Sequence, residues 1–181
     1  MNLRIALTVC AVATISACAG SGAMKSQFSQ ATLPASVQVP AGHAVALETM
    51  AAGDITYQCR AKADMAGQYE WVFAGPDAEL KDRSGKRVGK YYGPPATWEG
   101  NDGSRITGTQ LAVAPGGAGN IPLQLVKANP ASSAGIMQGV SHVQRVNTRG
   151  GVAPDAACAA TNMGAKQVVR YTADYVFWRA M

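Results

Sequence analysis

The chain has 181 residues, of which 48% are hydrophobic and 15% are charged, and its formal net charge is +5. This composition excludes a disordered chain, a coiled coil, a collagen-like protein, a Cys-rich knottin and a multispanning membrane protein. After the segment described next, about 164 residues remain (181 minus 17). That length fits one domain with its own core.

Residues 1–17 have the layout of a secretory signal. Arg4 supplies a positive charge, and residues 5–17 form an apolar run that is too short to cross a bilayer. The run ends in Ile15-Ser16-Ala17-Cys18, which resembles the bacterial lipobox. We therefore expect cleavage before Cys18 and acylation of its thiol and its new amine. The alternative is an ordinary signal, cleaved after Ala17 or Ala19, in which Cys18 has no role.

The lipobox predicts a location for the protein. Ala19, rather than Asp, follows Cys18, and this resembles the outer-membrane sorting pattern of Gram-negative lipoproteins. We expect a domain anchored to the outer membrane and facing the periplasm. Residues 18–36 are small and polar without periodicity, so we expect them to form a flexible tether. We expect residues 37–181 to form the domain. Phe28 is the only aromatic residue of the tether and could dock on the domain.

Alternation of apolar and polar residues predicts a series of β-strands along the domain. The segments with this pattern are 55–62, 69–73, 105–113, 121–128, 139–148 and 169–178. In the last strand, Val169, Tyr171, Ala173, Tyr175 and Phe177 share one face. Residues 75–80, with Pro76 near their start, predict one short helical turn. The expected fold is all-β: a single antiparallel β-sandwich or small β-barrel with one short helical turn.

Six segments in this region carry a family resemblance. They are 33–42, 57–59, 71–80, 93–104, 144–158 and 171–177, and they include the stretches WVFAGPDAEL and QRVNTRGG. These segments resemble DUF3455, a family of secreted bacterial and fungal proteins of unknown function. The resemblance implies one exported domain and no particular reaction. The family tends to carry a His where this chain has Tyr91 or Tyr92, and Pro95-Ala96 are extra residues.

The four cysteines have different expected fates. Cys10 leaves with the signal and Cys18 is lipidated, so Cys59 and Cys158 remain in an oxidising compartment. Two cysteines in that setting predict a disulfide. A metal site is the alternative, but His43 and His142 do not stand at ligand spacing from either cysteine. We expect no metal and no cofactor.

The segment 91–104 (YYGPPATWEGNDGS) concentrates the residues that could bind a ligand, and we expect it to form a loop and a turn. Aromatic rings would stack on an apolar or sugar ring, and carboxylates would accept hydrogen bonds from hydroxyls. The candidate residues are Tyr91, Tyr92, Trp98, Glu99, Asp102 and Ser104. In the alternative interpretation Trp98 belongs to the core, and Asp102-Gly103 is only a hairpin turn.

The function that these patterns favour is non-catalytic: a binding or structural module of the cell envelope. The expected partners are the membrane, through Cys18, and an envelope glycan, an anionic lipid or a small molecule, but no nucleic acid. Basic residues between Lys81 and Lys90 form either a patch for anionic lipid or a solvated hairpin. The alternative function is a hydrolase that acts on envelope glycans or esters through the carboxylates of the 91–104 segment.

Overall fold

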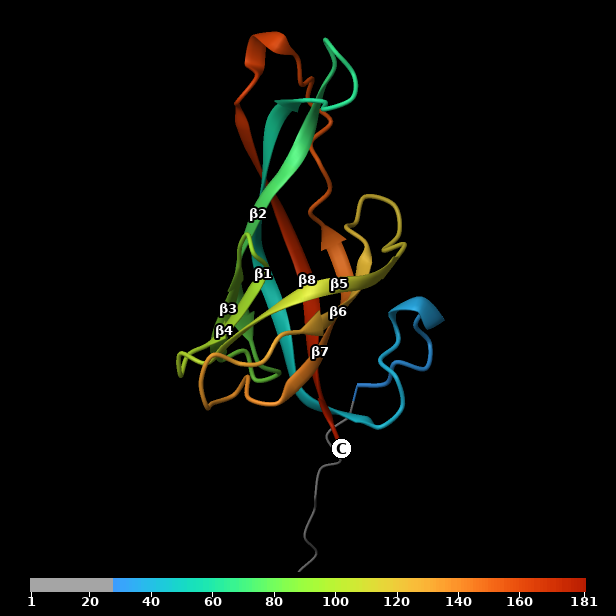
Figure 1. Cartoon of the computed structure of the whole chain (residues 1–181), viewed down its shortest axis with the longest axis vertical. Helices are drawn as coiled ribbons and strands as arrows, with labels where there is room; N and C mark the ends of the chain where they lie inside the picture. The colour runs from blue at the N-terminus through green and yellow to red at the C-terminus, as the bar shows by residue number, and fades with distance from the viewer. Residues whose placement is uncertain (1–27) are drawn as a thin grey trace, which may run out of the picture.

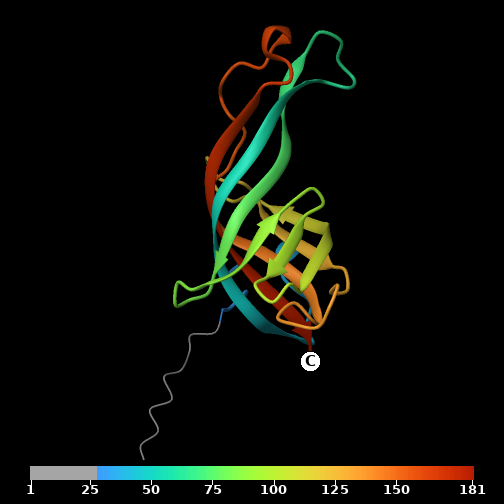
Figure 2. The same cartoon turned by 90° about the vertical axis from the view of Figure 1, so that its left-hand side faces the viewer.

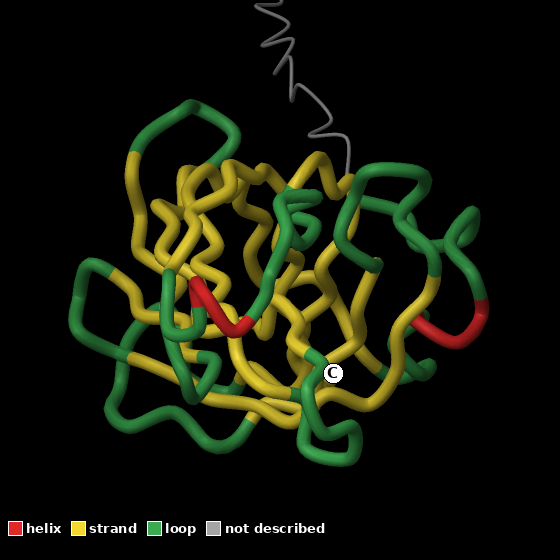
Figure 3. The backbone as a smooth tube through the Cα atoms, turned by 90° about the horizontal axis from the view of Figure 1, so that it is seen from above, coloured by secondary structure: helices red, strands yellow, loops and turns green. Residues whose placement is uncertain are grey.

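The computed structural model describes residues 28–181. Eight antiparallel strands pair in chain order, and β8 pairs back to β1, so the sheet closes into a barrel (Figures 1 and 3). The strands are β1 His43–Ala61, β2 Tyr69–Lys81, β3 Arg87–Tyr92, β4 Thr97–Gly100, β5 Arg105–Ala114, β6 Leu123–Ala128, β7 Val140–Gly150 and β8 Lys166–Ala180. Two single 3₁₀ turns, η1 Ala35–Val37 and η2 Ala160–Asn162, are the helical elements of this region. The predicted all-β antiparallel fold is confirmed.

β1, β2 and β8 are longer than the other strands and continue beyond the barrel as an arm, at the top of Figures 1 and 2. The predicted disulfide is confirmed within this arm. Cys59 of β1 bonds to Cys158, with an S–S distance of 2.01 Å and a Cα–Cα distance of 5.5 Å. The indole nitrogen of Trp71, on β2, donates to the carbonyl of Ala156 at 2.7 Å. The segment before β8 is therefore fastened to both strands of the β1–β2 hairpin.

The barrel interior is filled by alternating large and small residues. Tyr171 of β8 is in register with Gly53 of β1, which is in register with Ala78 of β2. The same row continues through Tyr91 of β3 to Trp98 of β4. A Cβ on Gly53 would clash with the carbonyl of Asp77 and with Ala78. Small residues on β1 and β2 thus leave room for the aromatic rings that face them.

A second apolar cluster lies outside the barrel, beneath residues 28–40, which we call the strap. Val37 and Val39 are buried against residues of β5 to β8, including Trp178. Phe28 makes an edge-to-face contact with Trp178 at a centroid distance of 6.3 Å, so its expected docking on the domain is confirmed. Folded chain thus begins before the predicted boundary at residue 37, and part of the expected tether is a strap on the domain.

Two local predictions are wrong. Residues 75–80 form no helical turn but belong to β2, where Pro76 pairs with Ile55 beside a β-bulge at Thr56/Tyr57. Bulges tolerate proline because the ladder is already interrupted there. The segment 91–104 is not only loop and turn, since it contains the end of β3 and all of β4.

Within residues 28–181, no helix is long and apolar enough to span a membrane. The predicted signal, Cys10 and the lipidation site Cys18 lie outside the described residues.

Candidate functional site

The six predicted ligand-binding residues occupy three separate places. Tyr91 and Trp98 point into the barrel, where they are 5% and 0% exposed. Their rings stack at a centroid distance of 4.8 Å, and Tyr175 packs against both. They form part of the core, so no surface ligand can stack on Trp98 in this conformation.

Tyr92 and Glu99 lie on the outer face of the β3–β4 hairpin. The Tyr92 hydroxyl donates to Glu99 Oε2 at 2.7 Å, and the Lys90 ammonium lies 3.5 Å from Glu99 Oε1. The hydrogen bond from Tyr92, followed by the charge of Lys90, lowers the pKa of Glu99. Glu99 therefore stays ionised, which does not suit a general acid.

Asp102 and Ser104 hold two loops together. Asp102 Oδ1 accepts hydrogen bonds from the Ser104 hydroxyl at 2.6 Å and the Ser104 amide at 3.0 Å. Its other oxygen accepts from the amide of Ile136, and the Ser104 hydroxyl accepts from the amide of Met137. These bonds, that of Ser104 first, lower the pKa of Asp102. Both residues fasten the β4–β5 turn to the segment before β7.

A different group of residues, which the sequence did not single out, meets inside the barrel. Arg145 of β7 is in register with Tyr175 of β8 and, on the other side, with Gln124 of β6. Cross-strand partners share a face, so Arg145 lies on the inner face with Tyr175. Its guanidinium donates to the carbonyl of Pro122 at 2.9 and 3.1 Å. Within residues 28–181, Arg145 forms no ion pair.

Three buried phenols lie near this guanidinium. Tyr171 and Tyr175 are 3% and 0% exposed. Their hydroxyls lie close to each other, and that of Tyr175 also lies close to Arg145, but neither makes a hydrogen bond of regular geometry. Burial raises the pKa of Tyr91, Tyr171 and Tyr175, and the charge of Arg145 only partly opposes this. All three phenols stay protonated and can donate a hydrogen bond. We call Arg145, Tyr91, Tyr171 and Tyr175 the arginine–tyrosine cluster.

The cluster lies toward the end of the barrel from which the arm emerges. Tyr57, at the base of the arm, donates from its hydroxyl to the carbonyl of Gly151 at 2.8 Å, and the charge of Arg145 also acts on its pKa. Phe73 is in register with Tyr57 and meets its ring edge to face, yet Phe73 remains 49% exposed.

This arrangement has a definite chemical character. A half-buried guanidinium without a carboxylate partner is costly, and buried polar groups are normally satisfied. A cation and neutral phenol donors together suit an anionic group, such as a carboxylate or a phosphate. Sequence reasoning placed Tyr171 and Tyr175 on one face correctly. It missed Arg145 because nothing in the pattern of residues 139–148 marks that position as facing inward.

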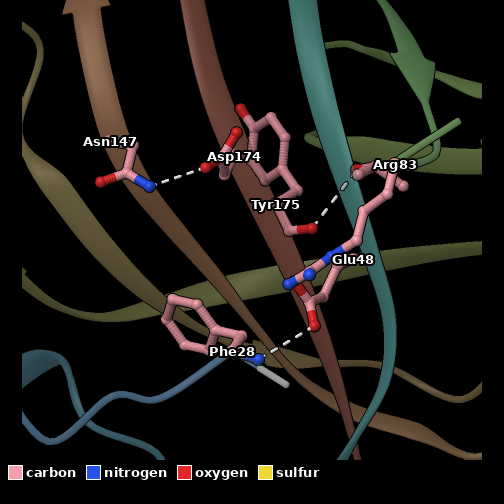
Figure 4. A network of polar contacts seen from close by, with 7 residues as sticks. Phe28, Glu48, Arg83, Asn147, Asp174 and Tyr175 are labelled. Carbon is pink, nitrogen blue, oxygen red and sulfur yellow. Dashed lines mark hydrogen bonds and ion pairs between the residues drawn. The ribbon is translucent and has the colours of Figure 1, made fainter. Parts of the chain in front are cut away.

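Three surface hollows are weaker candidates. One of about 400 Å³ lies over β1, β7 and β8 between Arg149 and Arg170, and one of about 550 Å³ lies among residues 130–140. A third, of about 230 Å³, lies beside the strap. Glu48 lines this third hollow, and it accepts hydrogen bonds from the amide of Phe28 at 3.1 Å and from Arg83 (Figure 4). Of the charged residues that line this hollow, Glu48 and Arg83 are paired with each other, and Asp174 accepts a hydrogen bond from Asn147.

The basic hairpin between β2 and β3 is also largely neutralised. Lys81 and Arg87 each approach Glu79, at 3.7 and 3.5 Å, and Arg83 pairs with Glu48. These pairs match the solvated hairpin better than a patch for anionic lipid.

Comparison with known proteins decides the family. The family model described as "Protein of unknown function (DUF3455)" matches residues 40–179. The chain belongs to the DUF3455 family. No curated protein and no solved structure matches the chain. The DUF3455 match spans β1 to β8 almost completely, so both the barrel and the arm belong to the family domain.

Proposed function

We propose that this DUF3455 protein is an exported, lipid-anchored module of the bacterial cell envelope that binds a small anionic ligand and catalyses no reaction. The observation that carries the binding role is the arginine–tyrosine cluster. Arg145 there has no ion-pair partner among the described residues, and the buried Tyr171 and Tyr175 hydroxyls beside it make no hydrogen bond of regular geometry. An anionic group in contact with these donors would satisfy all of them at once.

Two features support export and the absence of catalysis. The Cys59–Cys158 disulfide matches an oxidising compartment. The carboxylates proposed for a hydrolase have lowered pKa values and are bound to Tyr92 and Ser104. Neither is placed to deliver a proton.

The binding role is tested with simple anions on the purified full chain. Thermal unfolding is followed in sodium phosphate and in sodium acetate, each against sodium chloride at equal ionic strength. A ligand that binds only the folded state raises Tm with its concentration. We expect at least one of the two anions to raise Tm in the wild type, and this rise to disappear in Arg145→Gln.

The matched control is Arg60→Gln. Arg60 is exposed on the arm, and its guanidinium bonds only to Gln58 within the described region. This variant should keep the full anion response. No response in the wild type, or an equal response in Arg145→Gln, would refute the binding role.

The anchor is tested separately. Cys18→Ser should release the protein from membranes and abolish the incorporation of labelled palmitate, because the acylated thiol is gone. Membrane association of that variant, or palmitate incorporation into it, would exclude the lipobox. This outcome is independent of the anion experiment, since Arg145 and Cys18 are changed one at a time.

A further inference from the structure

The two histidines of the chain, His43 and His142, lie side by side although 99 positions separate them. His43 opens β1 and His142 lies near the start of β7. Their ring centroids are 4.7 Å apart, and the rings stand at 88° to each other. The pair lies on the outer face of the sheet, where His142 is in register with Lys127, and it is separate from the arginine–tyrosine cluster inside.

Hydrogen bonds fix the same tautomer on both rings. His43 Nδ1 lies 3.0 Å from the carbonyl oxygen of Pro40, which can only accept, so Nδ1 carries the proton. His142 Nδ1 lies 3.1 Å from the Ser141 hydroxyl. That hydroxyl donates its own proton to the carbonyl of Trp178 at 3.2 Å, so it accepts from His142. Each imidazole therefore keeps its lone pair on Nε2.

Both Nε2 atoms are available. Within residues 28–181 neither forms a hydrogen bond, and neither is among the fully buried polar atoms that lack a partner. An Nδ1–H bonded to a carbonyl or hydroxyl oxygen, with a free Nε2, is the arrangement in which histidine binds metals.

The separation of the rings also matches a shared ion. With metal–nitrogen distances of about 2.0–2.1 Å, two imidazoles on one ion have ring centres about 4.5 Å apart at a right angle and about 5.2 Å apart at the tetrahedral angle. The observed 4.7 Å falls between these values. Neutral imidazoles prefer copper, nickel and zinc to magnesium or calcium, and copper(II) forms the strongest complexes of the divalent series.

We propose that His43 and His142 form a two-histidine site for a transition-metal ion, copper(II) above all, with water in the remaining coordination positions. Lys127 is in register with His142, and its ammonium repels a cation bound there. Burial first, and the charge of Lys127 second, lower the pKa of His142. The site should therefore be of moderate affinity, and removing that charge should strengthen it.

The experiment titrates copper(II) into the full chain carrying Cys10→Ser and Cys18→Ser, which removes the competing thiols, with calorimetry and electron paramagnetic resonance as readouts. We expect one saturable site with signals from two imidazoles, and no comparable binding of magnesium. His43→Gln should weaken binding at least tenfold, and Lys127→Gln should tighten it.

His142→Gln should act like His43→Gln, but His142 is 5% exposed, so its fold is checked by thermal unfolding. His43, which is more exposed, keeps the test decisive if His142→Gln unfolds. Absence of saturable copper binding, or equal binding in the parent and His43→Gln, would overturn the proposal.

Discussion

Trp98 and Glu99 are neighbours in the chain whose side chains point to opposite sides of β4. Trp98 is fully buried against Tyr91 and Tyr175, whereas Glu99 lies on the outer face. We expect Trp98→Ala to lower the free energy of unfolding by about 3–5 kcal/mol, because it leaves a cavity in the core. Glu99→Gln should change it by less than about 1 kcal/mol, since it loses only a surface ion pair. Urea unfolding of both variants measures the difference. Equal losses would contradict the placement of Trp98 in the barrel core.

Asp102 makes stability depend on acidity. Its folded-state pKa lies below the usual 3.8, because the folded protein offers hydrogen bonds from Ser104 and Ile136. The stability that ionised Asp102 adds is therefore fully present above about pH 4, and it is lost as pH falls from 3.8 through the folded-state pKa. Denaturation midpoints measured between pH 7 and pH 2.5 should fall less steeply at the acidic end in Asp102→Asn. If the denaturation midpoints of Asp102→Asn fell with acid as steeply as those of the wild type, these bonds would add no pH-dependent stability.

The sequence predicts the direction of some of these side chains but not of others. Alternation correctly placed Tyr171, Tyr175 and Phe177 on one face of the last strand, because period two is a local property of a strand, and in the structure this face packs in the core. The six residues of the 91–104 segment could not be sorted in the same way. Their directions depend on where β3 and β4 begin and end, and thus on pairing with distant strands.

Among the elements, the strap has the most unusual attachment. Gln144 is fully buried, and its amide nitrogen donates to the carbonyl of Val37 at 2.7 Å and to Gln30 Oε1 at 2.9 Å. Its oxygen accepts from the Trp178 indole at 2.8 Å. A single amide thus links the strap to β7 and β8.

Removing that amide should loosen the strap selectively. Gln144→Ala leaves a buried indole N–H without a partner, so we expect a loss of about 1–3 kcal/mol. Hydrogen exchange should accelerate in residues 28–40 more than in β1 or β8. Gln38→Ala serves as a control, because the Gln38 side chain bonds only to Leu33 within the strap itself. Uniform acceleration across the domain would contradict a separate strap.

The sequence predicted only part of some strands. The strand at 55–62 was expected, but β1 begins at His43, and its part before residue 55 contains Ala44, Ala46, Ala51, Ala52 and Gly53. Small residues have low strand propensity, so local pattern missed them. They fit because the facing strands carry the large residues. The wrong turn at residues 75–80 has a similar cause, since pairing of Pro76 with β1 prevails over its local preference.

For the molecule as a whole, the disulfide is the covalent tie between the arm strand β1 and the segment before β8. It joins positions 99 residues apart, for which the chain-entropy model gives about 4.7 kcal/mol as an upper figure. Changing Cys59 and Cys158 together to alanine should lower the unfolding free energy by about 2–5 kcal/mol. Denaturation of the oxidised wild type, the reduced wild type and the double variant measures this loss of stability. The reduced wild type and the double variant, which both lack the disulfide, should have the same unfolding free energy. Identical midpoints in all three would show that the bond adds no stability.

The closure of the sheet sets the order in which the domain can be completed. β1 pairs with β8 along nearly its whole length, from Ala44 with Arg179 to Gln58 with Lys166. These partners are more than a hundred positions apart, and folds dominated by such distant pairings fold slowly. Until β8 arrives, β1 and β7 both present unpaired edges that can join another chain. A chain released without its last strand should therefore form aggregates rather than a smaller barrel. A chaperone would be needed most in the interval before β8 pairs with β1 and β7.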